Sequence, residues 1–208
     1  MRSNSLLTRL RHEVHSTVAE SNTEVGRADM KTLTISLFLS LLTAIALAQP
    51  VDIPKPPPGF HWQRAEEVKA AFLVPDGWHF KSEQNGKTQA YFATREDIDK
   101  DGKFLTGLTV NVVRHLEGED AAEYAKRFIA GFQDGKKVRK TWDPSMGSFA
   151  GAACLVEDEH AVMHTMMLAN RKTNTLYFFM FEAPKAEWQA AWQTGEQIVR
   201  FLLLDDEV

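Results

Sequence analysis

One segment constrains the fold more than any other: residues 176–182, which read Leu-Tyr-Phe-Phe-Met-Phe-Glu. Successive side chains of a strand point to opposite faces, so Leu176, Phe178 and Met180 would share one face. The aromatic residues between them would share the other. Because both faces are apolar, such a strand must be covered on both sides. We therefore expect it at the centre of a sheet, with a packing layer on each face.

Turn signals divide much of the remaining chain into short strands. Asn85-Gly86 is typical of a two-residue hairpin, and Pro75-Asp76-Gly77 is typical of a turn. The apolar or alternating segments between such signals predict strands. These strands are expected at 71–74, from Trp78 onward, and at 89–94, 108–113, 148–157, 162–169 and 176–182.

Two segments have the spacing of amphipathic helices. The first is expected at 121–132, with Asp120 or Glu119 as its cap. The second is expected to start at Pro184, and its apolar face includes Trp188, Trp192, Gly195, Ile198 and Leu202. Strands combined with such helices predict an α+β fold, in which one antiparallel β-sheet is sandwiched by helices.

Residues 30–48 have the organisation of a secretory signal peptide. Lys31 precedes an apolar run, and Ala46-Leu47-Ala48 supplies a cleavage site, so the mature chain would begin at Gln49. This predicts an exported protein, periplasmic or secreted. The run from Leu33 to Ala48 is shorter than the about 20 residues of a membrane-spanning helix, so no span is expected after cleavage.

The segments on either side of the signal peptide differ in character. Residues 1–29 are polar and are expected to be a non-native upstream extension, with the true start at Met30; the alternative is a weak amphipathic arm. Five prolines in residues 49–59 predict an extended linker. Residues 60–208 are then expected to form one domain.

Charge and cysteine content narrow the function classes. The net charge of -4 and the single short basic run at 136–140 give no electrostatic footprint for nucleic-acid binding. Cys154 is the only cysteine, so an intramolecular disulfide is impossible. Its apolar neighbours predict a buried, unreactive thiol.

The series Phe72-Leu73-Val74-Pro75-Asp76-Gly77-Trp78 resembles the opening of PsbP-like and Mog1-like domains. The order of the expected elements continues this resemblance over residues 60–205. It implies an antiparallel sheet sandwiched by helices, and an accessory or binding role more than catalysis. Such domains serve as photosystem II subunits, as a binding partner of a small GTPase, or as bacterial envelope proteins. A GTPase partner conflicts with export, so the exported bacterial branch fits best.

The segment 97–102, Asp-Ile-Asp-Lys-Asp-Gly, is the most chemically suggestive stretch. Carboxylates at Asp97, Asp99 and Asp101 match the first half of a calcium loop. The position that should supply a bidentate Glu is Leu108, which excludes a complete EF-hand. Two interpretations remain: the segment forms a partial Ca²⁺ site, or it is a solvated acidic loop that binds no metal. No other cofactor is expected.

Few other residues suggest a site. Trp142, in the expected loop Thr141-Trp142-Asp143-Pro144, is a candidate for an interaction surface because packing does not obviously explain it. His160 and His164 flank an expected strand, where four residues span about 13 Å, too far to share one metal ion. In residues 147–151, Ser148 does not occupy the middle position of a nucleophile elbow. No catalytic motif was found.

Three functions follow from these observations. The first is an exported accessory or binding protein of the cell envelope that recognises a protein partner. The alternative is a small-ligand or Ca²⁺-binding module using the 97–102 loop. The third is a hydrolase with a site built from scattered His and carboxylate side chains.

Overall fold

The computed structural model describes residues 53–207. The expectations for residues 1–29, for the signal peptide at 30–48 and for the start of the linker lie outside the described residues. Residues 53–57 have no regular secondary structure, and a turn at 58–59 precedes the first strand. Pro56–Val208 forms one compact unit.

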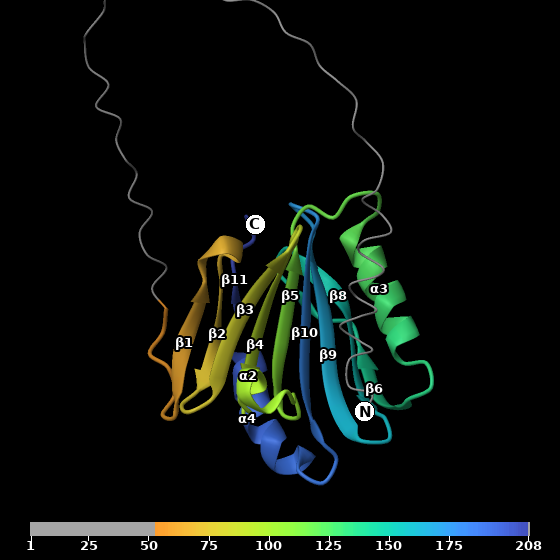
Figure 1. Cartoon of the computed structure of the whole chain (residues 1–208). Coiled ribbons are helices and arrows are strands. Elements are labelled where there is room, and N and C mark those ends of the chain that lie inside the picture. The colour runs from red at the N-terminus through yellow and green to blue at the C-terminus, as the bar shows by residue number, and fades with distance from the viewer. Residues whose placement is uncertain (1–52, 208) are drawn as a thin grey trace, which may run out of the picture. The chain divides into compact units, whose positions relative to one another are not determined.

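The larger of two sheets has eight strands, and all neighbouring strands are antiparallel (Figure 1). Its order is β3-β4-β5-β10-β9-β8-β6, and the short β7 also pairs with β8. β10 lies between β5 and β9, which confirms the central strand expected from its two apolar faces. The bounds are β3 His79–Asn85, β4 Thr88–Thr94, β5 Gly107–Val113, β6 Lys137–Trp142, β7 Ser145–Met146, β8 Phe149–Glu157, β9 Ala161–Asn170 and β10 Thr175–Pro184.

A second, three-stranded sheet was not expected from the sequence. It consists of β1 (Phe60–Ala65), β2 (Ala70–Pro75) and β11 (Leu203–Leu204), in the order β1-β2-β11, with a 3-10 turn at Glu66–Val68. Every residue of β2 is buried because the strand lies against the larger sheet: the rings of Phe72 and Tyr91 are 5.8 Å apart. The predicted strand at 71–74 therefore exists, but it belongs to this second sheet.

The two long helices cover opposite faces of the larger sheet. In α3 (Ala121–Phe132) the ring of Phe128 lies 5.6 Å from that of Phe178. In α4 (Trp188–Arg200) the ring of Trp188 lies 6.1 Å from that of Phe181. The side chains of residues 178 and 181 of β10 point to opposite faces of the larger sheet. The two helices that contact them therefore pack on opposite faces of this sheet. This confirms the α+β fold, in which α4 shares its face with the small sheet.

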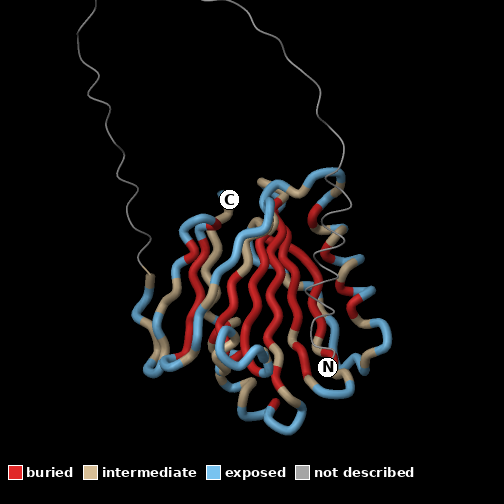
Figure 2. The backbone as a smooth tube through the Cα atoms, viewed as in Figure 1, coloured by how far each residue is buried: buried red, intermediate tan, exposed pale blue. Residues whose placement is uncertain are grey.

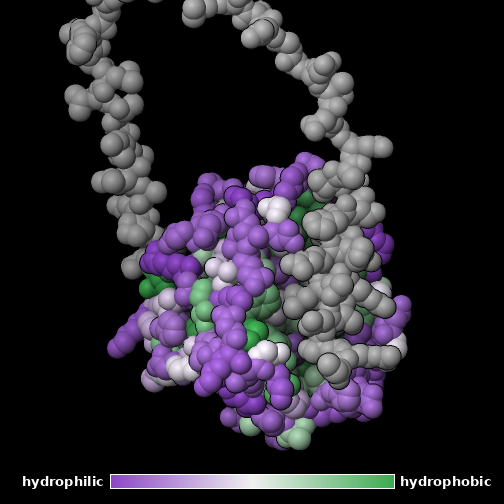
Figure 3. Space-filling view, in the orientation of Figure 1, coloured by the Kyte–Doolittle hydropathy of each residue, from purple (hydrophilic) through white to green (hydrophobic). Residues whose placement is uncertain are grey.

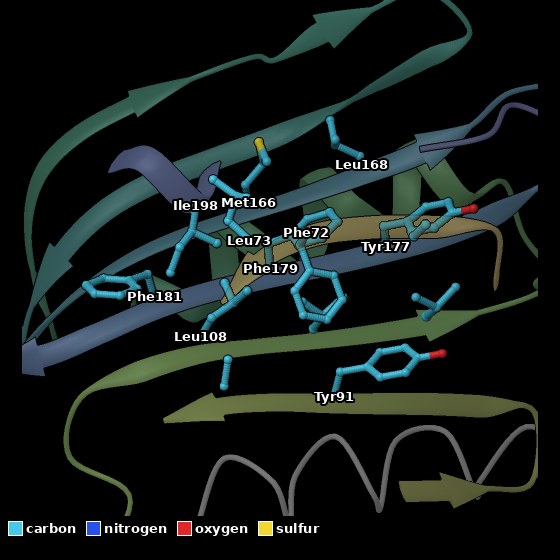
Figure 4. Packing of buried hydrophobic residues seen from close by; sticks show 14 of the residues in the cluster. Phe72, Leu73, Tyr91, Leu108, Met166, Leu168, Tyr177, Phe179, Phe181 and Ile198 are labelled. Atoms are coloured by element: carbon cyan, nitrogen blue, oxygen red, sulfur yellow. The ribbon is translucent and has the colours of Figure 1, made fainter. Parts of the chain in front are cut away.

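The main core fills the space between the larger sheet, the small sheet and α4. Figure 4 shows Tyr177, Phe179 and Phe181 of β10 packed with residues of β2, β5 and α4. The central strands are almost wholly buried (Figure 2), whereas the face visible in Figure 3 is mainly hydrophilic. None of the helices within residues 53–207 has the length and apolar character needed to cross a membrane.

Capping hydrogen bonds and turns determine where the two long helices begin. α3 spans the predicted residues because the Asp120 side chain accepts hydrogen bonds from the backbone N–H groups of Ala122 and Glu123. The expectation that a helix starts at Pro184 is wrong. Pro184 still pairs with Ala161 as the last residue of β10, and a turn follows before α4 begins at Trp188. Leu202 lies beyond the end of α4.

Candidate functional site

Trp142 does not lie in a loop, as the sequence indicated, but is the last residue of β6, where it pairs with Ala153. Its half-buried indole contacts the ring of His164 on β9, with 5.0 Å between centroids. His164 in turn stacks on Trp192 of α4 at 4.6 Å. Packing across three elements therefore holds Trp142 in place and leaves part of its ring at the surface.

This stack continues into a larger aromatic cluster at the same end of the sheet. Trp188 and Trp192 stack at 5.2 Å, and both lie against Phe181. Trp78 also stacks on Phe181, with 6.5 Å between the ring centroids. We call Trp78, Trp142, His164, Phe181, Trp188 and Trp192 the aromatic cluster. Its ring contacts support Trp142 from below through His164 and Trp192.

Burial changes the acid–base chemistry of the histidine in this cluster. Removal from water and, to a lesser degree, the nearby Lys140 ammonium lower the pKa of His164 from its ordinary 6.5 to about 4, against a backbone hydrogen bond that raises it. His164 is therefore neutral at pH 7. It acts there as an aromatic packing residue and not as a cation.

Four cations lie at this edge of the larger sheet, three from β6 and Lys185 from the turn after β10. Three of them converge on Glu157 of β8: Lys137 at 3.8 Å, Lys185 at 3.4 Å, and Arg139, whose Nε donates a 2.7 Å hydrogen bond. Hydrogen bonding to Arg139 lowers the pKa of Glu157, so this carboxylate is ionised. Lys140 places its ammonium 5.4 Å from the centre of the Trp142 ring. We call Lys137, Arg139, Lys140 and Lys185, with Glu157, the basic edge.

The basic edge lies on the border of the larger sheet. β6 is last in the strand order and pairs with β8 alone among the strands of residues 53–207. A register shift between Val138 and Lys140 makes room for Arg139 as an extra residue. Val138 of β6 is 45% exposed and Met146 of β7 is 49% exposed, so apolar side chains also reach the surface here.

Two of the three aspartates of the acidic loop, Asp97 and Asp99, are engaged in local side-chain contacts. The Asp97 carboxylate caps the short helix α2 (Ile98–Asp101) by accepting a hydrogen bond from the Lys100 N–H. Asp99 forms an ion pair with Lys81 of β3 at 2.7 Å. Among residues 53–207, no three His, Cys, Asp or Glu side chains are grouped so that they could hold a metal ion. Calcium binding by Asp97, Asp99 and Asp101 stays a prediction.

A buried thiol and a half-buried carboxyl group with shifted pKa values lie elsewhere in the larger sheet. Cys154 of β8 is buried, and desolvation raises the pKa of its thiol to about 11, which keeps it protonated. Glu182 of β10 has its pKa raised to about 7 by burial and by the charge of Asp158. Glu182 had no recognisable signal in the sequence, because an acid at the end of an apolar strand is usually solvated.

The basic edge was only partly visible in the sequence. The sequence shows the basic run at 136–140 and the nearby Trp142 directly. It does not show that they form a strand, because the bulge at Arg139 breaks the alternation of inward and outward side chains. Glu157 and Lys185 come from distant segments and join the site only when β8 and β10 are placed in the sheet.

No family model and no curated protein matches the sequence. Among solved structures, cyanobacterial PsbP from Synechocystis sp. PCC 6803 has a TM-score of 0.46 and 11% identity, and the match covers 71% of this chain and 93% of that one. The Ran-binding protein Mog1p of Saccharomyces cerevisiae has a TM-score of 0.45 and 14% identity, covering 70% and 95%. The chain is similar in fold to PsbP and Mog1.

A Pseudomonas aeruginosa protein also matches, with a TM-score of 0.37, 16% identity, and coverage of 66% of this chain and 94% of that one. These likenesses concern the fold alone. They carry no information on what this chain binds, which must come from its own residues.

Proposed function

We propose that this chain is an exported, non-enzymatic binding protein of the cell envelope, and that it recognises a protein partner through the basic edge and Trp142. One observation carries the proposal: a half-buried tryptophan, supported from below by His164 and Trp192, lies beside Lys140 on an edge strand. Tryptophan and arginine are enriched among the residues that carry most of the binding energy of protein interfaces, and Trp142 and Arg139 both lie on β6.

The charge distribution supports the choice of this surface. The whole chain has a net charge of -4, yet the basic edge has four cations and one carboxylate, and three of these cations contact that carboxylate. This local excess of positive charge favours a partner with negative charge and speeds their encounter. Export is supported by residues 30–48, which have the pattern of a signal peptide.

Site-specific photo-crosslinking in intact cells tests this function. A photoreactive side chain replaces Thr141, which is exposed on β6, and in a matched control it replaces Gln84, which is exposed on the opposite edge strand β3. We expect one dominant adduct in the envelope fraction from position 141 and none from position 84. N-terminal sequencing of the adduct should give Gln49 as the first residue.

Trp142→Ala supplies the second control. It should abolish the adduct at position 141, provided that the melting temperature shows the variant to be folded. Equal adducts at both edges, or an adduct that does not depend on Trp142, would contradict the proposal.

A further inference from the structure

We infer that the basic edge binds an acidic, extended segment of the partner by strand addition to β6. The inference rests on the proposed function and names the chemistry of the partner and the way it docks. It is drawn from the exposed backbone of β6, from the charges along it and from the faces to which its side chains point.

Within residues 53–207, the outer side of the β6 backbone is not paired with any strand. In an antiparallel ladder, alternate residues direct their N–H and C=O groups away from the neighbouring strand. β6 has β8 on one side, and within residues 53–207 it has no strand on the other. All its residues from Lys137 to Thr141 are exposed. Such an edge can accept one more strand.

The side chains of β6 determine which segments can pair with this edge strand. Lysine residues and a bulge are devices by which proteins prevent indiscriminate pairing at sheet edges. Two copies of this edge would bring like charges together, which disfavours pairing between copies of the chain. A segment that carries carboxylates removes this barrier and gains charge-assisted contacts with Lys137 and Lys140.

The register of β6 predicts the pattern of the partner segment. Lys137, Lys140 and Trp142 pair with Glu157, Leu155 and Ala153 of β8, whose side chains all point to the face that α4 covers. Val138 and Thr141 pair with Val156 and Cys154 and point to the opposite face. An added strand would place acidic residues beside the lysines and apolar residues beside Val138. The predicted ligand is therefore a short segment in which acidic and apolar residues alternate.

A synthetic peptide tests this inference on the full chain. The probe is an end-capped octapeptide of alternating Glu and Val, titrated at low salt while backbone amide signals are followed by NMR. We expect chemical-shift changes concentrated in residues 137–142, slower amide exchange there, and weaker binding at high salt. A Lys-Val octapeptide should cause no such changes. Changes spread over the surface, or none at millimolar peptide, would overturn the inference.

Two further controls separate strand addition from simple charge attraction. The Glu-Val octapeptide with alternate backbone nitrogens methylated keeps its charge but loses its donors, and equal binding by this peptide would exclude strand addition. Lys137→Glu/Lys140→Glu should weaken binding by about tenfold or more. Lys100→Glu/Lys103→Glu makes the same charge change on the distant acidic loop and should weaken it much less.

The outcomes distinguish this inference from the proposed function. If position 141 yields the Trp142-dependent adduct but the peptide does not bind at 137–142, strand addition is wrong and the proposed function stands. If neither is observed, the proposed function fails as well.

Discussion

Gly195 lies against the ring of Phe181, where α4 crosses β10. A Cβ at this position would be 2.7 Å from Cδ1 of Phe181, which is itself 1% exposed and has no room to move. We expect Gly195→Ala to destabilise the protein by about 1–3 kcal/mol, because overpacking outweighs the gain in helix propensity. Denaturant unfolding measures this change in the free energy of unfolding.

Gly131→Ala is the matched control in the other long helix. A Cβ at Gly131 meets no atom within 4 Å, so this variant should gain about 0.5–1 kcal/mol from helix propensity alone. An equal gain at both positions would show that Gly195 is not required for the packing of α4. The sequence placed Gly195 on the apolar face of a helix, but its contact with Phe181 depends on how two distant segments meet.

The elements that the sequence predicted well are those with a strong periodic signal. The helix at 121–132 has both a capping aspartate and a helical apolar stripe, and β10 has two apolar faces. β1 and β6 were missed because neither alternates cleanly: both are edge strands, and β6 carries a bulge. Edge strands bury less of their surface, so their sequences are less constrained. The candidate site lies mainly on such a strand.

The loop containing α2 gives a prediction about calcium. A Ca²⁺ ion would need Asp97 to leave its helix cap and Asp99 to leave Lys81, because carboxylates at alternate positions must converge on the ion. If the loop binds calcium, millimolar Ca²⁺ raises the melting temperature of the wild-type chain and not that of Asp101→Ala. Mg²⁺ at the same concentration is the control for ionic strength. An unchanged melting temperature removes the calcium hypothesis.

For the whole molecule, His164 and Glu182 make opposite contributions to the dependence of stability on pH. His164 has its pKa lowered from 6.5 to about 4, so its contribution is present above pH 6.5 and is lost as pH falls toward 4. Glu182 has its pKa raised from 4.5 to about 7, so its contribution is present below pH 4.5 and is lost as pH rises toward 7. Each difference corresponds to about 3 kcal/mol.

Because the two windows overlap between pH 4.5 and 6.5, the two effects should largely cancel in the wild-type chain. Single variants should separate them. Relative to wild type, His164→Phe keeps an aromatic ring between Trp142 and Trp192 and should become more stable as pH falls through this window. Glu182→Gln should become less stable, because only the histidine then opposes folding at low pH.

Urea unfolding at half-unit steps of pH measures the free energy of unfolding of both variants. The exposed carboxylates contribute equally to each profile. If the free energy of unfolding varies with pH in the same way in both variants, His164 and Glu182 do not control the pH dependence of stability. If the two profiles have opposite slopes, the pH dependence arises from these two residues, one on each face of the larger sheet.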